Sequence, residues 1–443
     1  MVHFGILCLP LAGHLNPMTT LGHELQRRGH RVTVFGLLDI QPNVVSPGLS
    51  FWTLGETDYP LGSLKKSLRN LGELYGGAAL KYTTNLCKEG ATVILRDAPK
   101  AIKEAGVKIL LIDQSVLEGQ TIAQHLDIPF ITICNALILN SEPGVALGFF
   151  FWQYNSSWWG HLRNRIGRYV FLPMLLGRPG LSLIRLIQNH RDQWNLPVYS
   201  ASDDNPWSQL AQISQQPSEF EFYRHRLPKY FHFTGPYSNP ASRKSVVDFP
   251  YERLTGKPLI YASLGTLQNR LRGVFYDIAE ACVGMNIQLV ISLGGTVNQE
   301  FLSKLPGDPL VVEYAPQLEL LQKASLTITH GGLNTTLESL SNGIPLVAIP
   351  ITNDQLGVAA RIAKTGTGEV VRLSRLGRVN VPKLRAAIQQ VLTENSYREK
   401  ASRLQEAIRQ AGGVSHAADI VEQVVYTGKP VFPDAPPNFI EGI

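Results

Sequence analysis

Short apolar runs alternate with longer amphipathic stretches along most of this chain of 443 residues. In the first half, the runs expected to be strands cover residues 3–9, 31–35, 50–53, 108–112 and 129–133. A strand, a helix and a second strand at this spacing form a βαβ unit, and the two strands of such a unit are parallel. The alternation therefore predicts an α/β fold built on a parallel sheet.

The same alternation starts again in the second half of the chain, after an interruption. Residues 238–257 are polar, contain prolines and show no periodicity, which is typical of an interdomain linker. The strands expected after them are 258–262, 287–292, 310–313, 325–329, 345–349 and 369–372. We therefore expect two α/β domains, at residues 1–237 and 258–426, a helical pattern over 397–426, and a tail at 427–443.

The first helix has clear signals at both ends. Asn16 is a candidate N-cap, and Pro17 suits a first helical turn. Arg27, Arg28 and Gly29 are residues that often end a helix. The sequence thus predicts that this helix begins near residue 16 and ends near residue 29.

Composition narrows the classes of ligand. Apolar residues make up 44% and charged residues 17% of the chain, so the protein is globular and not disordered. The net charge of +6 is mild for this length and forms no basic stripe of the kind that binds nucleic acid. A small anionic substrate or an anionic membrane surface fits this charge at least as well.

The cysteines and the N-terminus indicate a cytoplasmic protein. Cys8, Cys87, Cys134 and Cys282 form no C-x-x-C pair, and we interpret them as buried free thiols in a reducing compartment. The chain starts directly with an apolar strand pattern, without a basic segment before it, so we expect no signal peptide. We see no apolar run of about 18 residues, and therefore expect no membrane-spanning helix.

The loop at residues 11–17, between the first strand and the first helix, faces the ligand side of an open α/β sheet. It has one glycine, Gly13, where a dinucleotide-binding loop needs three, so a Rossmann dehydrogenase is excluded. It presents His14 instead, and Asp113 ends a strand at the same edge of the sheet. A loop histidine bonded to the backbone, or an aspartate that caps a helix, would explain each residue alone. Together they favour an acid–base pair.

The most informative segment of the second half is 314–355. A strand ends at His330, two glycines follow it, and a helix begins near Asn334. Glycines allow a close approach, and the free N–H groups of a helix N-terminus bind a diphosphate. Glu338 could hold ribose hydroxyls, Asp354 and Gln355 could hold a sugar, and Tyr314 could stack on a flat base. An ordinary strand-to-helix loop would explain the glycines but not the other residues.

These residues resemble the donor signature of the UDP-dependent glycosyltransferase superfamily with the GT-B fold. The resemblance implies two Rossmann-like domains that face each other across a cleft, with C-terminal helices that cross back to the first domain. It places His330 and Thr335 on the diphosphate, Gln317 and Glu338 on the ribose, and Asp354 and Gln355 on the sugar. It implies His14 as catalytic base and Asp113 behind it. The implied donor site comprises Ser263, Gly265, Thr266, Tyr314, Ala315, Gln317, His330, Gly332, Asn334, Thr335, Glu338, Asp354 and Gln355.

Other stretches resemble a narrower group, the bacterial zeaxanthin glucosyltransferases. They are residues 141–147, 210–237 and 263–268, and the resemblance implies transfer of glucose to a carotenoid hydroxyl. The aromatic segment 149–159, with arginines after it, would suit a long apolar acceptor at a bilayer surface, although its side chains could equally be part of the core of the first domain. The acceptor residues we expect are Phe149, Phe150, Trp152, Trp158 and Trp159.

The expected reaction is an inverting transfer of a sugar, with the UDP-sugar as co-substrate and with no cofactor. The chain contains no Asp-x-Asp motif, so we expect no metal ion on the diphosphate. The expected location is the cytoplasm, with peripheral contact to the membrane, and no nucleic acid as partner. The alternatives are another lipophilic acceptor (a macrolide, flavonoid or sterol), a nucleotide-sugar epimerase, and a binding protein without catalysis.

Overall fold

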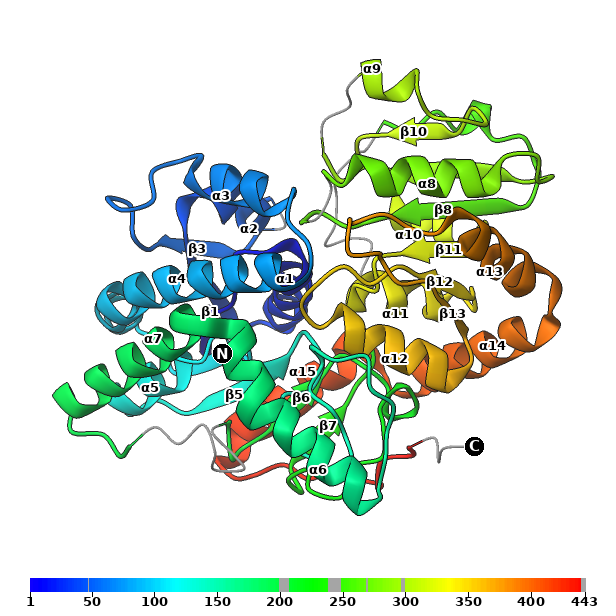
Figure 1. Ribbon diagram of the computed structural model, residues 1–443. Coiled ribbons are helices and arrows are strands. Elements are labelled where there is room, and N and C mark those ends of the chain that lie inside the picture. Colours follow the sequence, from blue (N-terminus) through cyan, green and yellow to red (C-terminus); the bar gives the residue numbers. More distant parts are fainter. Residues whose placement is uncertain (47, 199–206, 238–247, 268–269, 296–298, 440–443) are drawn as a thin grey trace.

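A computed structural model describes residues 1–46, 48–198, 207–237, 248–267, 270–295 and 299–439. Its described part contains two parallel β-sheets, one in each half of the chain (Figure 1). The first sheet has seven strands in the order β3-β2-β1-β4-β5-β6-β7. The strands are β1 (His3–Leu7), β2 (Arg31–Gly36), β3 (Ser50–Thr53), β4 (Ile109–Asp113), β5 (Phe130–Cys134), β6 (Gln212–Ser214) and β7 (Phe231–Phe233).

The second sheet has six parallel strands in the order β10-β9-β8-β11-β12-β13. They are β8 (Leu259–Ser263), β9 (Gln288–Ser292), β10 (Leu310–Val312), β11 (Ala324–Thr329), β12 (Leu346–Ala348) and β13 (Gly368–Val370). All the strands expected from the sequence are present, and the two α/β domains are confirmed. The sequence did not predict β6 and β7, because strands of three residues are too short to show a period.

Helices cover both faces of the first sheet, and successive residues of its strands pack into opposite layers. Phe4 and Ile6 lie in one core with α1, whereas Leu7 lies in another core with α4 and α7. The helical elements of this domain are α1 (Ala12–Arg27), η1 (Leu38–Ile40), α2 (Gln41–Val45), α3 (Ser63–Leu71), α4 (Gly76–Ala105), α5 (Gly119–His125), α6 (Trp158–Ile166), η2 (Gly167–Phe171), α7 (Leu172–Gln193) and η3 (Ser218–Phe220). Burial on both faces explains why the strands are apolar runs without alternation.

The predicted start of the first helix is wrong. Helix α1 begins at Ala12, its N-cap position is Leu11, and Pro17 lies inside it. Asn16 is therefore a helical residue and not the cap. Pro17 has no N–H to donate to the carbonyl of Gly13, four residues earlier, so that carbonyl is open to another donor.

The second domain repeats the arrangement of a sheet between two helical layers. The helical elements in this half of the chain are η5 (Tyr251–Arg253), α8 (Arg272–Cys282), α9 (Gln299–Leu302), α10 (Gln317–Leu321), α11 (Leu333–Ser341), α12 (Gln355–Thr365), α13 (Val381–Thr393), α14 (Asn395–Gln410) and α15 (Gly413–Thr427). One layer holds α8 and α13, and the other holds α11, α12 and α14. The predicted helical stretch 397–426 is broken at Gly412, where φ is +83°.

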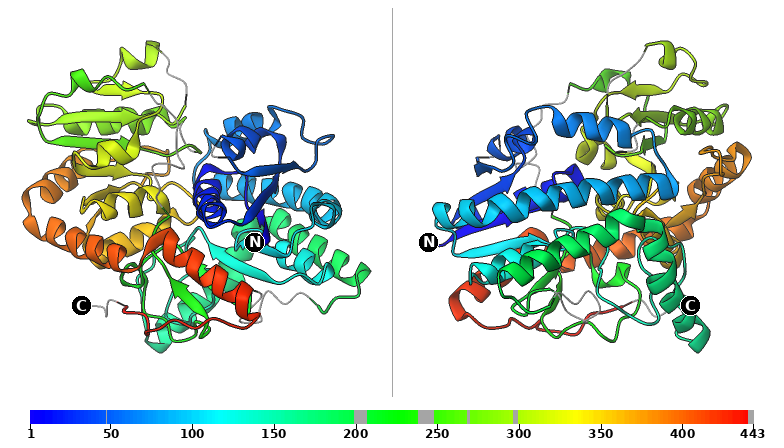
Figure 2. Two further views of the ribbon diagram at one scale, coloured as in Figure 1. Left: turned by 180° about the vertical axis from the view of Figure 1, so that it is seen from behind. Right: turned by 60° about the vertical axis from the view of Figure 1, so that its left-hand side comes forward.

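Helix α15 returns to the first domain, as expected from the GT-B resemblance. Its residues Ala417 and Val421 belong to the core that contains α1. Arg28 at the end of α1 donates hydrogen bonds to Asp419 and Glu422. Figure 2 shows α15, in red, against the first domain. The end of the chain therefore packs on the first domain, although it follows the second domain in the sequence.

The linker is described only in part, and the cysteines form no disulfide. Residues 238–247, the first half of the predicted linker, lie outside the described residues, as do 440–443 of the tail. All four cysteines are free, as predicted, and Cys87 is the one that is only partly buried.

Candidate active site

His14 and Asp113 come together at the carboxyl edge of the first sheet. His14 lies in the first turn of α1, after β1, and Asp113 is the last residue of the neighbouring strand β4. Nδ1 of His14 is 2.6 Å from a carboxylate oxygen of Asp113. The Asp113 side chain is fully buried, whereas 17% of the His14 side chain is exposed. Nε2 of His14, on the far side of the ring from Asp113, is the nitrogen that can accept a proton from a ligand.

The two residues shift each other's pKa toward the ionised pair. Burial of the imidazole lowers its pKa, but the charge and hydrogen bond of Asp113, with a further contribution from Asp354, raise the pKa of His14 above 6.5. Burial raises the pKa of Asp113, yet His14 and the N–H of Ser115 hold it below 3.8. The aspartate therefore stays ionised and can stabilise an imidazolium beside it.

The loops after β8 and β11 approach each other so closely that only glycine fits between them. A Cβ atom on Gly265 would lie 2.7 Å from Cε1 of His330, and a Cβ atom on Gly332 would lie 2.6 Å from it. A Cβ atom on Gly294 would lie 2.1 Å from the carbonyl oxygen of Gly265. These glycines hold the His330 ring between two backbone segments. The sequence indicated Gly265 and Gly332 but not Gly294.

The start of helix α11 can bind an anion. Its N-cap residue is Gly332, and no side chain makes a cap hydrogen bond there, so the N–H groups of the first turn remain available to a ligand. Burial lowers the pKa of His330 to about 4, against the opposing effect of a hydrogen bond to the backbone of Ser263. His330 is therefore neutral at physiological pH. It can donate a hydrogen bond to a phosphate, while the helix terminus supplies the positive potential.

A chain of polar side chains continues from α11 toward α10. The amide nitrogen of Gln317 donates to the carboxylate of Glu338. The hydroxyl of Tyr261, a buried residue of β8, donates to the amide oxygen of Gln317 at 3.0 Å. Tyr261 therefore fixes which way the Gln317 amide faces. Sequence reasoning singled out Gln317 and Glu338 but missed Tyr261, because a tyrosine in an apolar strand carries no functional signal.

Asp354 and Gln355 lie where α12 begins, but they differ in their contacts. A carboxylate oxygen of Asp354 accepts a bond from the N–H of Leu137 in the first domain, at 3.4 Å, and burial raises its pKa. The amide oxygen of Gln355 accepts the N–H groups of Ile351 and Thr352, both at 2.9 Å. Gln355 thus holds the loop before α12 in place. The carboxylate of Asp354 interacts with the charge of His14.

The other predicted donor residues lie along the same edge of the second sheet. The hydroxyl of Ser263 accepts the N–H of Gly265 at 3.2 Å. Thr266 is exposed, Ala315 is half-buried, and Thr335 is buried beside Gln317. Half of the Tyr314 surface, 51%, is exposed, so its ring is accessible to a flat base.

Asn334 joins the two domains at the predicted site. Its amide nitrogen donates to the carbonyl oxygen of Gly13 at 2.9 Å, the carbonyl that Pro17 leaves without a helical donor. Its amide oxygen accepts a bond from Gln215, which follows β6, at 2.8 Å. Sequence reasoning assigned Asn334 to the donor and did not predict Gln215. The contact sets the predicted donor loop directly against the first turn of α1, which carries His14.

The five aromatic residues predicted to bind the acceptor do not form one cluster in the described ring contacts. Phe150 and Trp152 stack on each other at 4.4 Å, and the Arg163 guanidinium lies over Trp152. Trp158 and Trp159 stack on each other at 3.6 Å and are exposed at the start of α6. Phe149 is half-buried in the segment before them. Among the described contacts, none joins these five residues to His14 or Asp113, so their role in acceptor binding stays a prediction.

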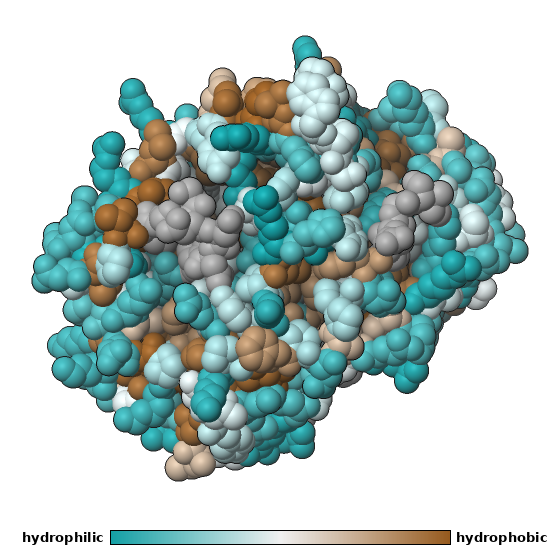
Figure 3. All heavy atoms as spheres, turned by 90° about the horizontal axis from the view of Figure 1, so that it is seen from below, coloured by the Kyte–Doolittle hydropathy of each residue, from teal (hydrophilic) through white to brown (hydrophobic). Residues whose placement is uncertain are grey.

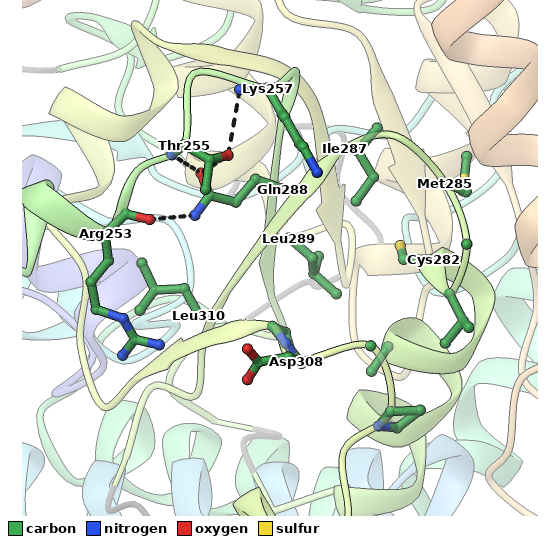
Figure 4. A pocket seen from close by; sticks show the side chains of 16 residues that line it. Arg253, Thr255, Lys257, Cys282, Met285, Ile287, Gln288, Leu289, Asp308 and Leu310 are labelled. Carbon is green, nitrogen blue, oxygen red and sulfur yellow. Dashed lines mark hydrogen bonds between the residues drawn. The ribbon is translucent and has the colours of Figure 1, made fainter.

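A pocket of about 440 Å³ lies elsewhere in the second domain (Figure 4). Gln288 and Leu310 line it, and they begin β9 and β10. Gln288 also bonds to the backbone of Arg253 and Thr255, the chain just before β8. The pocket is therefore at the amino edge of the second sheet, opposite to the carboxyl edge that carries the predicted donor loops, and it is separate from the candidate site.

Comparison with known proteins finds relatives that cover both domains of the chain. A family model described as UDP-glucoronosyl and UDP-glucosyl transferase matches residues 209–410, which include the predicted donor loops. The zeaxanthin glucosyltransferase of Pantoea ananas is 33% identical over 433 residues, 97% of this chain and 98% of its own length. The zeaxanthin glucosyltransferase of Pseudescherichia vulneris is 31% identical, over 96% of this chain and 98% of its own.

Solved structures of glycosyltransferases share the fold. The kitacinnamycin glycotransferase has a TM-score of 0.73 at 23% identity, over 95% of this chain and 98% of its own. The calicheamicin glycosyltransferase CalG4 has a TM-score of 0.69 at 21% identity, over 97% of this chain and 100% of its own. These matches span both domains, which confirms the expected GT-B arrangement. Because identity above 30% also extends over nearly the whole length of two relatives, the chain belongs to the UDP-glucoronosyl and UDP-glucosyl transferase family and is a glycosyltransferase that uses a nucleotide sugar.

Proposed function

We propose that this enzyme transfers glucose from UDP-glucose, with inversion, to a hydroxyl group of a lipophilic acceptor of the carotenoid class, such as zeaxanthin. The observation that carries the chemical part is the His14–Asp113 pair held against the donor loop by Asn334. The carotenoid acceptor and the glucose rest on the two zeaxanthin glucosyltransferases, which are similar over the full length. We also propose a cytoplasmic location with peripheral contact to the membrane.

In the proposed mechanism, Nε2 of His14 removes the proton from the acceptor hydroxyl while Nδ1–H donates to Asp113. The hydroxyl oxygen forms a bond to the anomeric carbon, and the bond from that carbon to the diphosphate oxygen breaks. A single displacement of this kind inverts the anomeric configuration. The N–H groups at the start of α11, with His330 as a neutral donor, stabilise the negative charge of the leaving diphosphate. The proton on His14 then passes to solvent.

Recognition of the nucleotide is proposed to depend on Glu338. The two carboxylate oxygens of Glu338 match two neighbouring hydroxyl groups. Gln317 orients this carboxylate, and Tyr261 in turn orients the amide of Gln317. A ribose has both the 2′ and the 3′ hydroxyl, whereas deoxyribose lacks the 2′ hydroxyl. The arrangement therefore favours UDP over TDP as the nucleotide of the donor.

A second candidate differs only in the acceptor. The demethyllactenocin mycarosyltransferase of Streptomyces fradiae is 28% identical over 95% of this chain. The proposed site chemistry would serve a macrolide, flavonoid or sterol hydroxyl equally well. The difference must come from the shape of the acceptor side.

A product assay tests the proposed function. The purified enzyme is incubated with UDP-glucose, UDP-galactose or TDP-glucose and with hydroxylated carotenoids, flavonoids or macrolides, and the products are identified by mass. We expect glucosylated carotenoid, made preferentially from UDP-glucose. Products from flavonoids or macrolides alone would contradict the carotenoid assignment and support the second candidate. Sugar epimerisation without any acceptor would contradict transfer itself.

The pH dependence tests the roles of His14 and Asp113. Because His14 must be neutral to accept a proton and its pKa is raised, kcat/KM should fall as the pH drops below that raised pKa. Asp113→Asn removes the charge that raises the pKa of His14, so the acid limb should move to lower pH. The plateau should also fall, because the ring loses the partner that holds it.

The control for this profile is Glu118, a buried carboxyl nearby. Burial, with a smaller effect of the Asp113 charge, raises the pKa of Glu118 to about 7, so this group titrates in the same range. Glu118→Gln should leave the acid limb in place. If the limb moves in Glu118→Gln and not in Asp113→Asn, then Glu118 and not His14 controls the activity.

A further inference from the structure

The helices that follow the aromatic segment leave a large apolar surface uncovered. We call the segment Trp158–Gln193, which comprises α6, η2 and α7, the basic helical arm. Met174 is 74% exposed and Trp159 is 63% exposed. Leu162, Tyr169 and Phe171 are exposed as well. Soluble proteins rarely present so many large apolar side chains together, and such patches mark sites of interaction.

The charge of the basic helical arm has one sign over nearly all its length. Between Trp158 and Arg191 the sequence has six arginines and no aspartate or glutamate. Arg165, Arg178 and Arg185 are exposed, and within the described residues they form no ion pair. In Figure 1, α6 lies toward the front of the molecule, and this side is at the top of Figure 3. There, apolar groups lie next to strongly polar ones (Figure 3). The surface is thus apolar and cationic together.

The arm meets the length and composition of a membrane span but lies along the first domain. Its most apolar window of 18 residues has a mean hydropathy of 1.5 and is 17% buried. The expectation of no membrane-spanning helix did not include this window, because Arg178 and Arg185 interrupt its apolar residues. The backbone of Gly177 is not helical (φ 60°, ψ −153°), so the arm bends there. Beyond the bend, Leu183 and Ile187 are buried in the same core as α4, which keeps this half of the arm on the domain.

A second copy of the chain fits this surface poorly. A symmetric dimer sets the same patch against itself, which would bring arginines against arginines. The arm has no acidic residue between Trp158 and Arg191 to compensate that charge. An anionic bilayer offers what the surface lacks, because its phosphate groups pair with arginine and its interfacial layer accepts tryptophan, tyrosine and methyl-rich side chains.

We propose that the basic helical arm docks the enzyme on the surface of an anionic phospholipid bilayer. The apolar side chains enter the boundary between headgroups and acyl chains, and Arg165, Arg178 and Arg185 bind lipid phosphates. Since α7 packs along α4 in the same domain as His14, docking would set that domain next to molecules dissolved in the bilayer. The proposal does not depend on which acceptor the enzyme uses.

Vesicle sedimentation of the full-length enzyme tests the proposal. The probes are vesicles of phosphatidylcholine alone and of an equimolar mixture with phosphatidylglycerol. We expect the enzyme to sediment with the mixed vesicles, less so in high salt. Arg165→Gln with Arg178→Gln should weaken this binding by roughly fivefold for each charge removed. Trp159→Ser should weaken it as well, because an interfacial anchor is lost.

Matched variants separate this surface from general charge and from misfolding. Arg398→Gln with Arg403→Gln removes the same charge from exposed positions on α14, and Leu376→Ser removes an exposed apolar side chain from the second domain. Both controls should sediment as the wild type does, and all variants should bind UDP. Equal losses in test and control variants would overturn the proposal. So would a wild-type dimer that Trp159→Ser converts to a monomer, because the surface would then bind a second copy.

Discussion

Replacing His14 with alanine should lower kcat for sugar transfer by about 10²–10⁴-fold, the usual contribution of a positioned general base. UDP binding should remain. In the described contacts, the His14 side chain makes its hydrogen bond to Asp113 in the first domain, and not to the predicted donor loops. The measurement is steady-state turnover with UDP-glucose and the identified acceptor, together with calorimetric titration of UDP. The two readouts distinguish a loss of chemistry from a loss of the donor site.

The control for this variant is His23→Ala on the same helix. His23 is half-buried on α1 and lies more than two helical turns from His14, so its loss should leave kcat unchanged. Turnover of His14→Ala within a few-fold of the wild type would show that another group removes the proton. Loss of UDP affinity in His14→Ala would instead assign this residue to the structure of the donor side.

Replacing Glu221 with alanine should reduce the free energy of unfolding by about 3–5 kcal/mol, because it leaves buried cations without their partner. Glu221 lies after β6 in the first domain, and its carboxylate pairs with Arg361 on α12 and with Arg224. All three side chains are at most 2% exposed. In a domain of this size, each kcal/mol corresponds to roughly 2–4 °C in Tm. Thermal unfolding measured by circular dichroism checks the shift.

The pH dependence gives this prediction a second readout. Burial raises the pKa of Glu221, but Arg224 and Arg361 lower it by more, to about 2, from 4.5. Its contribution to stability is therefore complete above pH 4.5 and is lost as the pH falls toward 2, so the difference between wild type and Glu221→Ala should shrink over that range. Glu406→Ala, which removes an exposed ion pair on α14, should leave Tm unchanged. Equal Tm values for the two variants would show that Glu221 is hydrated in solution.

Local patterns predicted the elements of the fold well where those elements are long or buried on both sides. The strand that ends at Asp113 is an apolar run, the strand before His330 alternates apolar and hydroxyl-bearing residues, and each is central in its sheet. The start of α1 was mispredicted because Asn16 and Pro17 are common at helix starts, but Ala12 to Leu15 are also helical here. A contact from the other domain satisfies the carbonyl of Gly13, and local propensity contains no information about such a contact.

The residues of the candidate site also fall into those that a local pattern can predict and those that it cannot. The spacing of His330, Gly332 and Glu338 is a property of one loop and one helix, so the sequence alone could indicate it. Gln215 donates a hydrogen bond to Asn334, which is 119 positions away in the sequence. Tyr261 donates one to Gln317, which is 56 positions away. Their own neighbourhoods in the sequence have no motif. Pairings of this kind are decided by how the sheets and domains stack.

The sequence by itself determined the two parallel-sheet domains, the position of the predicted donor loop after β11 and the two residues of the proposed acid–base pair. Each of these depends on periodicity or on residues next to a strand end, and the carboxyl ends of parallel strands always meet at one edge. Only the tertiary structure decided how Asn334 closes the two loops against each other and how Glu221 and Arg361 join the domains. It also showed that the basic helical arm is exposed, because burial depends on which surfaces pack together, and an amphipathic sequence is compatible with a covered or an open face.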